Sequence, residues 1–147
     1  MNGEPNLIII ADDDSDDILF FLTALLSRPI ELTVITVPNG ERLIEILEAV
    51  SPNFIFLDIN MPKKNGFESL KVIRSEKKTN QPTVIMCSTS NAGNDLKISQ
   101  ELGADMYVVK PNNVEHLGKM IDEIFKRDWT GKAKERMPEK FLLTHVQ

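Results

Sequence analysis

A short apolar run that ends in an aspartate constrains the fold of this chain more than any other feature. Residues 54–57 are all apolar, Asp58 follows them directly, and the next loop contains Met61, Pro62 and Gly66. A continuous apolar run bounded by turn residues is typical of a strand that is buried on both faces of a parallel sheet. Asp58 is therefore predicted to stand at the carboxyl end of a central strand, where open α/β sheets bind their ligands.

The same pattern, a strand followed by a helix, occurs five times along the chain. The apolar runs lie at residues 7–11, 31–37, 54–57, 83–87 and 106–109, and apolar residues with helical spacing follow at 18–26, 43–50, 67–75, 95–102 and 117–125. Alternating strands and helices predict an α/β fold, a doubly wound parallel sheet with right-handed crossovers and helices on both faces. The helix at 95–102 has few apolar residues and is expected to be the least firmly packed.

The bulk composition indicates one soluble globular domain. The chain has 147 residues, of which 41% are hydrophobic and 27% charged, and residues 6–127 are predicted to form the domain, with 128–147 as a C-terminal extension. A net charge of -5 argues against nucleic-acid binding. The sequence shows neither a membrane-length apolar run nor a signal peptide, so we expect a cytoplasmic protein with no membrane contact. The single cysteine, Cys87, lies in an apolar strand and is expected to pack in the core.

Polar side chains stand at the ends of four of the predicted strands, namely Asp12 with Asp13, Asp58, Ser88 and Lys110. Because these strand ends share one edge of a doubly wound sheet, the side chains are predicted to converge. Clustered carboxylates repel one another unless a cation lies between them, and oxygen ligands without His or Cys favour Mg²⁺. Such a site suits phosphoryl transfer to an aspartate, with the ammonium and the hydroxyl stabilising phosphoryl oxygens.

In these residues the chain resembles the receiver domains of response regulators, the family of the bacterial chemotaxis regulators. The resemblance spans about residues 6–127 and implies a flavodoxin-like (βα)5 fold whose five-stranded sheet has the order 2-1-3-4-5. The matching positions are the acidic pair Asp12 and Asp13, the strand-end Asp58 with Met61, Pro62 and Gly66, the hydroxyl of Ser88, the aromatic Tyr107, and Lys110 with Pro111.

The resemblance implies a single-domain response regulator of a two-component phosphorelay, which is a switch and not an enzyme. Asp58 would accept a phosphoryl group from a histidine kinase or a histidine phosphotransfer protein, assisted by Lys110 and Ser88. The output would be contacts with a downstream protein that the sequence does not identify, and a homodimer is a further expectation. The loop after Asp58 and the tail resemble stand-alone regulators that partner phytochrome-type kinases.

The resemblance also implies roles for the neighbouring residues. Asp13, Asp58 and the backbone carbonyl of Asn60 would bind Mg²⁺ directly, whereas Asp12 would act mainly through water. Ser88 and Tyr107 would carry the switch, and the Lys110–Pro111 peptide would be cis.

Two positions depart from the commonest pattern of the receiver family. Ser88 replaces the more frequent threonine, and Thr89 stands where a smaller residue is frequent, so looser switching and slower access to the site are expected.

Three other functions compete with the phosphoacceptor switch. A receiver-shaped binding module that is never phosphorylated would also fit this fold. A dehalogenase-type phosphatase would need an aspartate at Asn60, and a flavin carrier would need a hydroxyl-rich loop in place of residues 12–14.

Overall fold

A six-stranded sheet organises the computed structural model, which describes residues 6–77, 81–89, 93–129 and 141–143. All neighbouring strands are parallel and the order is β2-β1-β3-β4-β5-β6. The strands are β1 (Asn6–Ala11), β2 (Leu32–Val37), β3 (Phe54–Asp58), β4 (Thr83–Ser88), β5 (Met106–Val109) and β6 (Leu142–Leu143). The first five strands confirm the predicted flavodoxin-like order.

The sixth strand corrects the prediction of a five-stranded sheet. It comes from the C-terminal extension and pairs with β5, with Tyr107 opposite Leu142 and Val108 opposite Leu143. Residues 141–143 are apolar, but a two-residue strand is too short to produce a period-2 pattern, so the sequence does not predict a strand here. Residues 130–140 and 144–147 of the predicted extension lie outside the described residues.

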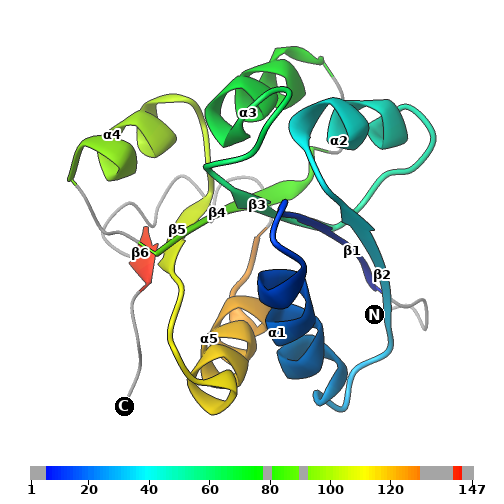
Figure 1. The fold of residues 1–147 in the computed structure, drawn as a ribbon, viewed down its shortest axis with the longest axis vertical. Helices are drawn as coiled ribbons and strands as arrows, with labels where there is room; N and C mark the ends of the chain where they lie inside the picture. The colour runs from blue at the N-terminus through cyan, green and yellow to red at the C-terminus, as the bar shows by residue number, and fades with distance from the viewer. Residues whose placement is uncertain (1–5, 78–80, 90–92, 130–140, 144–147) are drawn as a thin grey trace.

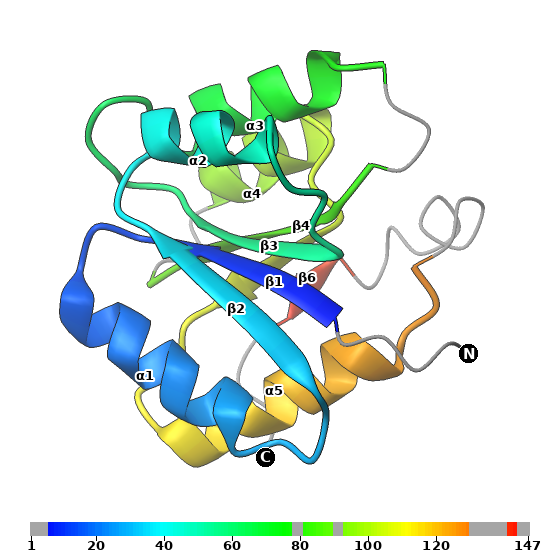
Figure 2. The same cartoon turned by 90° about the vertical axis from the view of Figure 1, so that its right-hand side faces the viewer.

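Five helices cover the two faces of the sheet. Helices α1 (Ser15–Leu26) and α5 (Val114–Lys126) lie on one face, and α2 (Gly40–Leu47), α3 (Gly66–Ser75) and α4 (Gly93–Glu101) lie on the other (Figures 1 and 2). Four of them begin at a side chain that accepts hydrogen bonds from first-turn amides, which satisfies donors that a helix start leaves unpaired. These capping residues are Asp14, Asn39, Asn65 and Asn113. None of the described helices is long and apolar enough to cross a membrane.

The sheet separates two apolar cores, because successive side chains of a buried strand point to opposite faces. Ile8 and Ile10 of β1 belong to the core under α1 and α5, whereas Ile9 belongs to the core on the other face. Residues 54–57 of β3 are all buried, which confirms the central strand. Cys87 is buried as predicted. In α4 the only buried side chain is that of Ser99, so this helix is the thinly packed one that the sequence predicted.

The loop between β3 and α3 holds the end of β3 tightly. A Cβ atom added to Gly66 would lie 2.4 Å from the carbonyl oxygen of Asp58, so the loop can approach the strand end only with glycine at this position. The Gly66 amide donates to the carbonyl of Ile59 at 2.8 Å. Lys63 and Lys64 have φ angles of 50° and 93°, in the region that favours glycine. This loop therefore sets the position of Asp58.

The expected cis peptide at Lys110–Pro111 is wrong for this structure, since no peptide bond among the described residues is cis. The trans form is also the intrinsic preference of an X–Pro bond. The amide of Lys110 donates to the carbonyl of Ser88 at 2.7 Å, which ties the end of β5 to the end of β4. Lys110 thus keeps its predicted place at the carboxyl edge of the sheet.

Candidate functional site

Three carboxylates gather where β1 and β3 end. These strands are neighbours, with Ala11 paired to Leu57, so Asp12 and Asp58 follow side by side at the same edge. Carboxylate oxygens of Asp12, Asp13 and Asp58 lie within 4.8 Å of one another. The side chains of Asp12 and Asp58 are 7% and 12% exposed, whereas Asp13 is exposed. The predicted acidic cluster is therefore present, with Asp12 and Asp58 mostly buried and Asp13 open to solvent.

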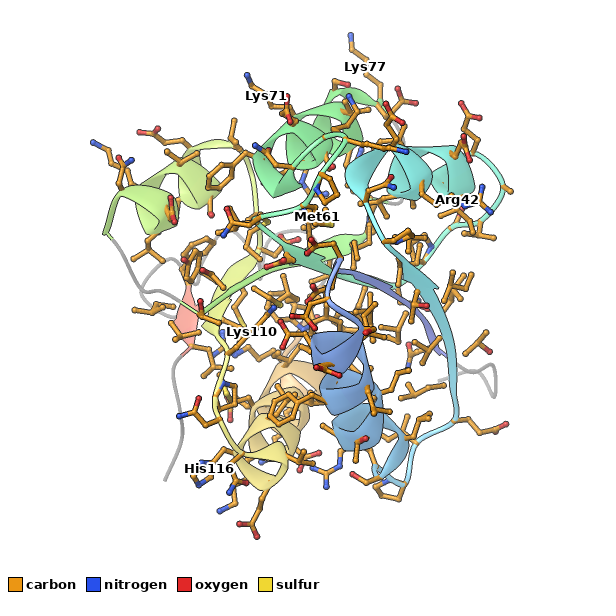
Figure 3. All side chains as sticks on the ribbon, in the orientation of Figure 1. Arg42, Met61, Lys71, Lys77, Lys110 and His116 are labelled. Carbon is orange, nitrogen blue, oxygen red and sulfur yellow. The ribbon has the colours of Figure 1, made fainter. Side chains whose placement is uncertain are left out.

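The ammonium group of Lys110 is the cation of this cluster. Its Nζ lies 2.9 Å from Asp12 Oδ2 and 3.5 Å from Asp58 Oδ1, and the side chain is only 11% exposed. Figure 3 shows Lys110 between β5 and the start of α1. The other oxygen of Asp12, Oδ1, accepts the amide of Asp14 at 3.0 Å. Both oxygens of Asp12 are thus engaged, which leaves Asp13 and Asp58 with more free lone pairs for a metal ion.

Asp17 is a site residue that the sequence analysis missed. Its Oδ2 lies 3.2 Å from Lys110 Nζ, although 42% of the side chain is exposed. Asp14, Asp16 and Asp17 form an acidic run whose sequence predicts a solvated surface and no role in the site. Asp14 is the N-cap of α1, and this cap puts Asp17 in the first turn, where it contacts Lys110. The available signal was the capping pattern, which fixes the helix start and thereby the residue that faces the site.

Burial controls the charge of Asp58. Desolvation raises the pKa of this carboxyl to about 6, although the Lys110 charge opposes the shift, and the nearby Asp12 and Asp13 add to it. For Lys110, desolvation favours the neutral amine, but Cys87 and the neighbouring carboxylates of Asp12 and Asp58 outweigh it, so the pKa of the ammonium is raised. At neutral pH Lys110 is therefore charged. Asp58 beside it is mostly ionised, although burial makes its ionised form less stable than it would be in water.

Replacing Asp58 by asparagine is expected to stabilise the protein at pH 7.5 in the absence of Mg²⁺. The pKa of Asp58 is about 6 in the folded state and 3.8 in the unfolded state. Between these pH values the folded state binds more protons than the unfolded state, so the free energy of unfolding falls as the pH rises. Removing that titration should raise the free energy of unfolding by about 2–3 kcal/mol at pH 7.5, and the gain should vanish near pH 4.

Urea unfolding at pH 4.0, 5.5 and 7.5 would measure this difference. The exposed Asp16→Asn is the matched control, since it removes one charge of the same acidic segment without a buried partner. A gain that is as large at pH 4.0 as at pH 7.5 would contradict the assignment of the shift to Asp58.

The hydroxyl and aromatic positions lie at the next two strands of the sheet. Ser88 is the last residue of β4 and is 4% exposed, and Tyr107 of β5 is wholly buried. Desolvation raises the pKa of the Tyr107 phenol, and a hydrogen bond with the Ser88 side chain partly opposes this shift. Asn60 and Thr89 are both exposed beside the strand ends. The structure thus brings Ser88 and Tyr107 together, while the carbonyl of Asn60 stays a predicted ligand.

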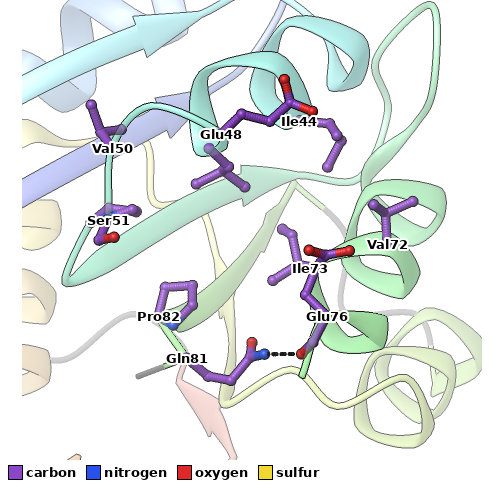
Figure 4. A pocket seen from close by; sticks show the side chains of 11 residues that line it. Ile44, Glu48, Val50, Ser51, Val72, Ile73, Glu76, Gln81 and Pro82 are labelled. Carbon is purple, nitrogen blue, oxygen red and sulfur yellow. Dashed lines mark hydrogen bonds between the residues drawn. The ribbon is translucent and has the colours of Figure 1, made fainter. Parts of the chain in front are cut away.

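A separate pocket of about 110 Å³ lies at the other edge of the sheet, where β3 and β4 begin (Figure 4). Apolar side chains of α2 and α3, together with Pro52 and Pro82, form most of its wall, and Glu48 and Glu76 line it as well. No member of the carboxylate cluster lines this pocket. The acidic side chains of the predicted site therefore lie at the carboxyl edge of the sheet and not in this pocket.

Comparisons with known proteins agree with this geometry. The sequence model of the response regulator receiver domain matches residues 8–122. The transcriptional regulatory protein CpxR of Escherichia coli (strain K12) is 37% identical over 125 residues, which cover 83% of this chain and 50% of CpxR. The nitrate/nitrite response regulator protein NarL of Escherichia coli (strain K12) is 32% identical over 123 residues, covering 83% of this chain and 56% of NarL. The chain thus spans about half the length of these curated relatives.

Solved structures show the same similarity. The Mn²⁺-bound form of the response regulator Rcp1 has a TM-score of 0.75 at 27% identity, with 86% of this chain and 98% of Rcp1 covered. The phosphorylated cyanobacterial phytochrome response regulator RcpA has a TM-score of 0.76 at 28% identity, covering 84% of this chain and 93% of RcpA.

Proposed function

This chain belongs to the response regulator receiver domain family, and we propose that it is a Mg²⁺-dependent phosphoacceptor switch in which Asp58 carries the phosphoryl group. The observation that supports this most directly is the contact of Lys110 with both Asp12 and Asp58 beside an exposed Asp13. A cation and several carboxylates around one buried strand-end aspartate form the arrangement that an aspartyl phosphate requires.

The nucleophile would be a carboxylate oxygen of Asp58. It forms the new bond to phosphorus while the bond from phosphorus to the donor's nitrogen or oxygen breaks, and the leaving group takes the electron pair. Because the pKa of Asp58 is about 6, most of the carboxyl is already ionised at pH 7.5. Lys110 would balance the added charge of the phosphoryl oxygens, and the hydroxyl of Ser88 would donate to one of them.

The carboxylate cluster fits a divalent cation. Its oxygens lie within 4.8 Å of one another and its members are all hard oxygen ligands, which suits Mg²⁺ better than a transition metal. Asp13, Asp58 and the carbonyl of Asn60 would hold the ion, while Asp12, already bound to Lys110, would act through water. Bound there, Mg²⁺ would supply charge neutralisation for the phosphoryl oxygens.

The proposed domain comprises residues 6–127, and residues 128–147 would be an extension whose segment 141–143 joins the sheet. A histidine kinase or a histidine phosphotransfer protein is the proposed phosphodonor. RcpA is a cyanobacterial phytochrome response regulator, and its similarity to this chain supports a phytochrome-type kinase as that donor. The proposed output is a change in protein contacts, with no reaction on an external substrate.

Intact-mass spectrometry after incubation with acetyl phosphate tests this proposal. We expect one phosphoryl adduct on the wild-type chain that requires Mg²⁺, no adduct on Asp58→Asn, and a normal adduct on the exposed control Asp16→Asn. A persistent adduct on Asp58→Asn would place the phosphoryl group elsewhere. No adduct on the wild type, with this donor and with a panel of kinases, would favour a constitutive binding module.

A further inference from the structure

The C-terminal strand β6 closes the edge of the sheet beside Tyr107. The amide of Tyr107 donates to the carbonyl of Phe141 at 2.8 Å, and β6 continues parallel to β5 from there. Figure 1 shows β6 at the end of the sheet, between the layer that contains α4 and the layer that contains α5. Without this segment, β5 would be an edge strand with its backbone unpaired on that side.

Two buried side chains anchor the segment, one in each core. Phe141 is 6% exposed and belongs to the same apolar cluster as Tyr107, and Leu143 is 9% exposed and belongs to the cluster under α1 and α5. Leu142 between them is 38% exposed. Trp129, the last described residue before the segment, is held at the end of α5, where its indole N–H donates to the carbonyl of Ile124 at 2.8 Å. A two-residue strand with two anchors is a weak, separable unit that stays tethered when it opens.

Tyr107 connects this segment to the phosphoryl site. The Tyr107 side chain is wholly buried next to Ser88 while the segment is docked. The Ser88 hydroxyl can donate to a phosphoryl oxygen and accept from the phenol at the same time, and such chains of hydrogen bonds reinforce one another. The state with Tyr107 buried is therefore the state that suits a phosphorylated Asp58.

We propose that residues 141–143 form a detachable strap that positions Tyr107 beside Ser88, so that docking of the strap and phosphorylation of Asp58 favour each other. This inference rests on the proposed function and adds a second site to it. Coupling between two sites is reciprocal, so an anchored strap promotes phosphorylation to the same extent that phosphorylation tightens the strap. Phe141 and Leu143 are positioning residues in this scheme, because they act on the reaction through Tyr107.

The test uses the full chain and two readouts. The first is hydrogen exchange of the Tyr107 amide, measured by NMR, because this amide is bonded to Phe141. The second is the ¹⁹F signal of fluorotyrosine, which reports only on Tyr107 because the chain has one tyrosine. Each is recorded with and without beryllofluoride and Mg²⁺, which together mimic a phosphoryl group on a carboxylate.

The anchor variant Phe141→Ala with Leu143→Ala should exchange the Tyr107 amide about tenfold faster or more and should shift the fluorine signal. The control Leu142→Ala, in the same strand but more exposed than the two anchors, should stay within about twofold of wild type. Beryllofluoride should slow hydrogen exchange of the Tyr107 amide in the wild type by about fivefold or more. The anchor variant should accept a phosphoryl group from acetyl phosphate correspondingly more slowly than the wild type.

The outcomes separate the two proposals. If Asp58 is phosphorylated but beryllofluoride leaves Tyr107 exchange and the fluorine signal unchanged, the strap inference is overturned and the proposed function stands. If the anchor variant matches Leu142→Ala in both readouts, the strap does not position Tyr107. If wild-type Asp58 takes no phosphoryl group, the proposed function fails first, and the coupling fails with it.

Discussion

Replacing Lys110 by methionine is expected to slow phosphorylation of Asp58 by acetyl phosphate about a hundredfold or more. Methionine keeps the length and the apolar stem of lysine but removes the ammonium that lies 2.9 Å from Asp12 and 3.5 Å from Asp58. The phosphoryl oxygens would then meet an uncompensated cluster of carboxylates. The pKa of Asp58 would also rise further, because the charge that opposes its desolvation is lost.

The measurement is a time course of the phosphoryl adduct by intact-mass spectrometry at saturating Mg²⁺. Lys119→Met on the exposed face of α5 is the matched control and should react at the wild-type rate. Circular dichroism would verify that both variants are folded. Equal rates for Lys110→Met and Lys119→Met would remove Lys110 from the chemistry and leave it with a structural role only.

Replacing Gly66 by alanine is expected to lower the free energy of unfolding by about 2–3 kcal/mol. The new methyl group would lie 2.4 Å from the carbonyl oxygen of Asp58 and 2.8 Å from the Cα atom of Ile59, so the backbone itself must move. Because the displaced atoms include those of Asp58, the proposed phosphoacceptor, phosphorylation should also slow in the fraction of protein that remains folded.

Urea unfolding compares this variant with Gly93→Ala, the control that the chain itself offers. A Cβ atom at Gly93 would have no neighbour within 4 Å among the described residues, so this substitution should leave stability unchanged or raise it slightly. If Gly66→Ala unfolds at the same urea concentration as Gly93→Ala, the close approach between the loop and the strand end does not constrain the fold.

The strand order and the convergence of the site follow from the sequence because they depend on strong local signals. The continuous apolar runs at β1 and β3 fix which residues are buried, and the polar residue that ends each run must then stand at the carboxyl edge. The contact of Lys110 with Asp12, across 98 positions of sequence, follows from this topology alone. The resemblance to receiver domains adds the proposed role of each residue, and the topology places the residue at the edge of the sheet.

The features that the sequence did not predict depend on weak or long-range effects. Asp17 contacts Lys110 because of where the α1 cap places the first helical turn, and an acidic run does not show which member faces inward. The strand β6 forms because it pairs with the open edge of β5 and lets Phe141 and Leu143 bury their side chains. The strand propensity of its own two residues does not explain it. The trans Lys110–Pro111 bond departs from the family expectation, which no local pattern could test.

The short strand β6 also bears on how this protein behaves at high concentration. The strand that it covers, β5, reads Met-Tyr-Val-Val, an uncharged run rich in β-formers. An exposed edge of this kind invites pairing with other copies and is a common origin of aggregates. A variant trimmed before Phe141 for crystallisation would uncover that edge and is expected to lose solubility, so the whole segment should be kept in such work.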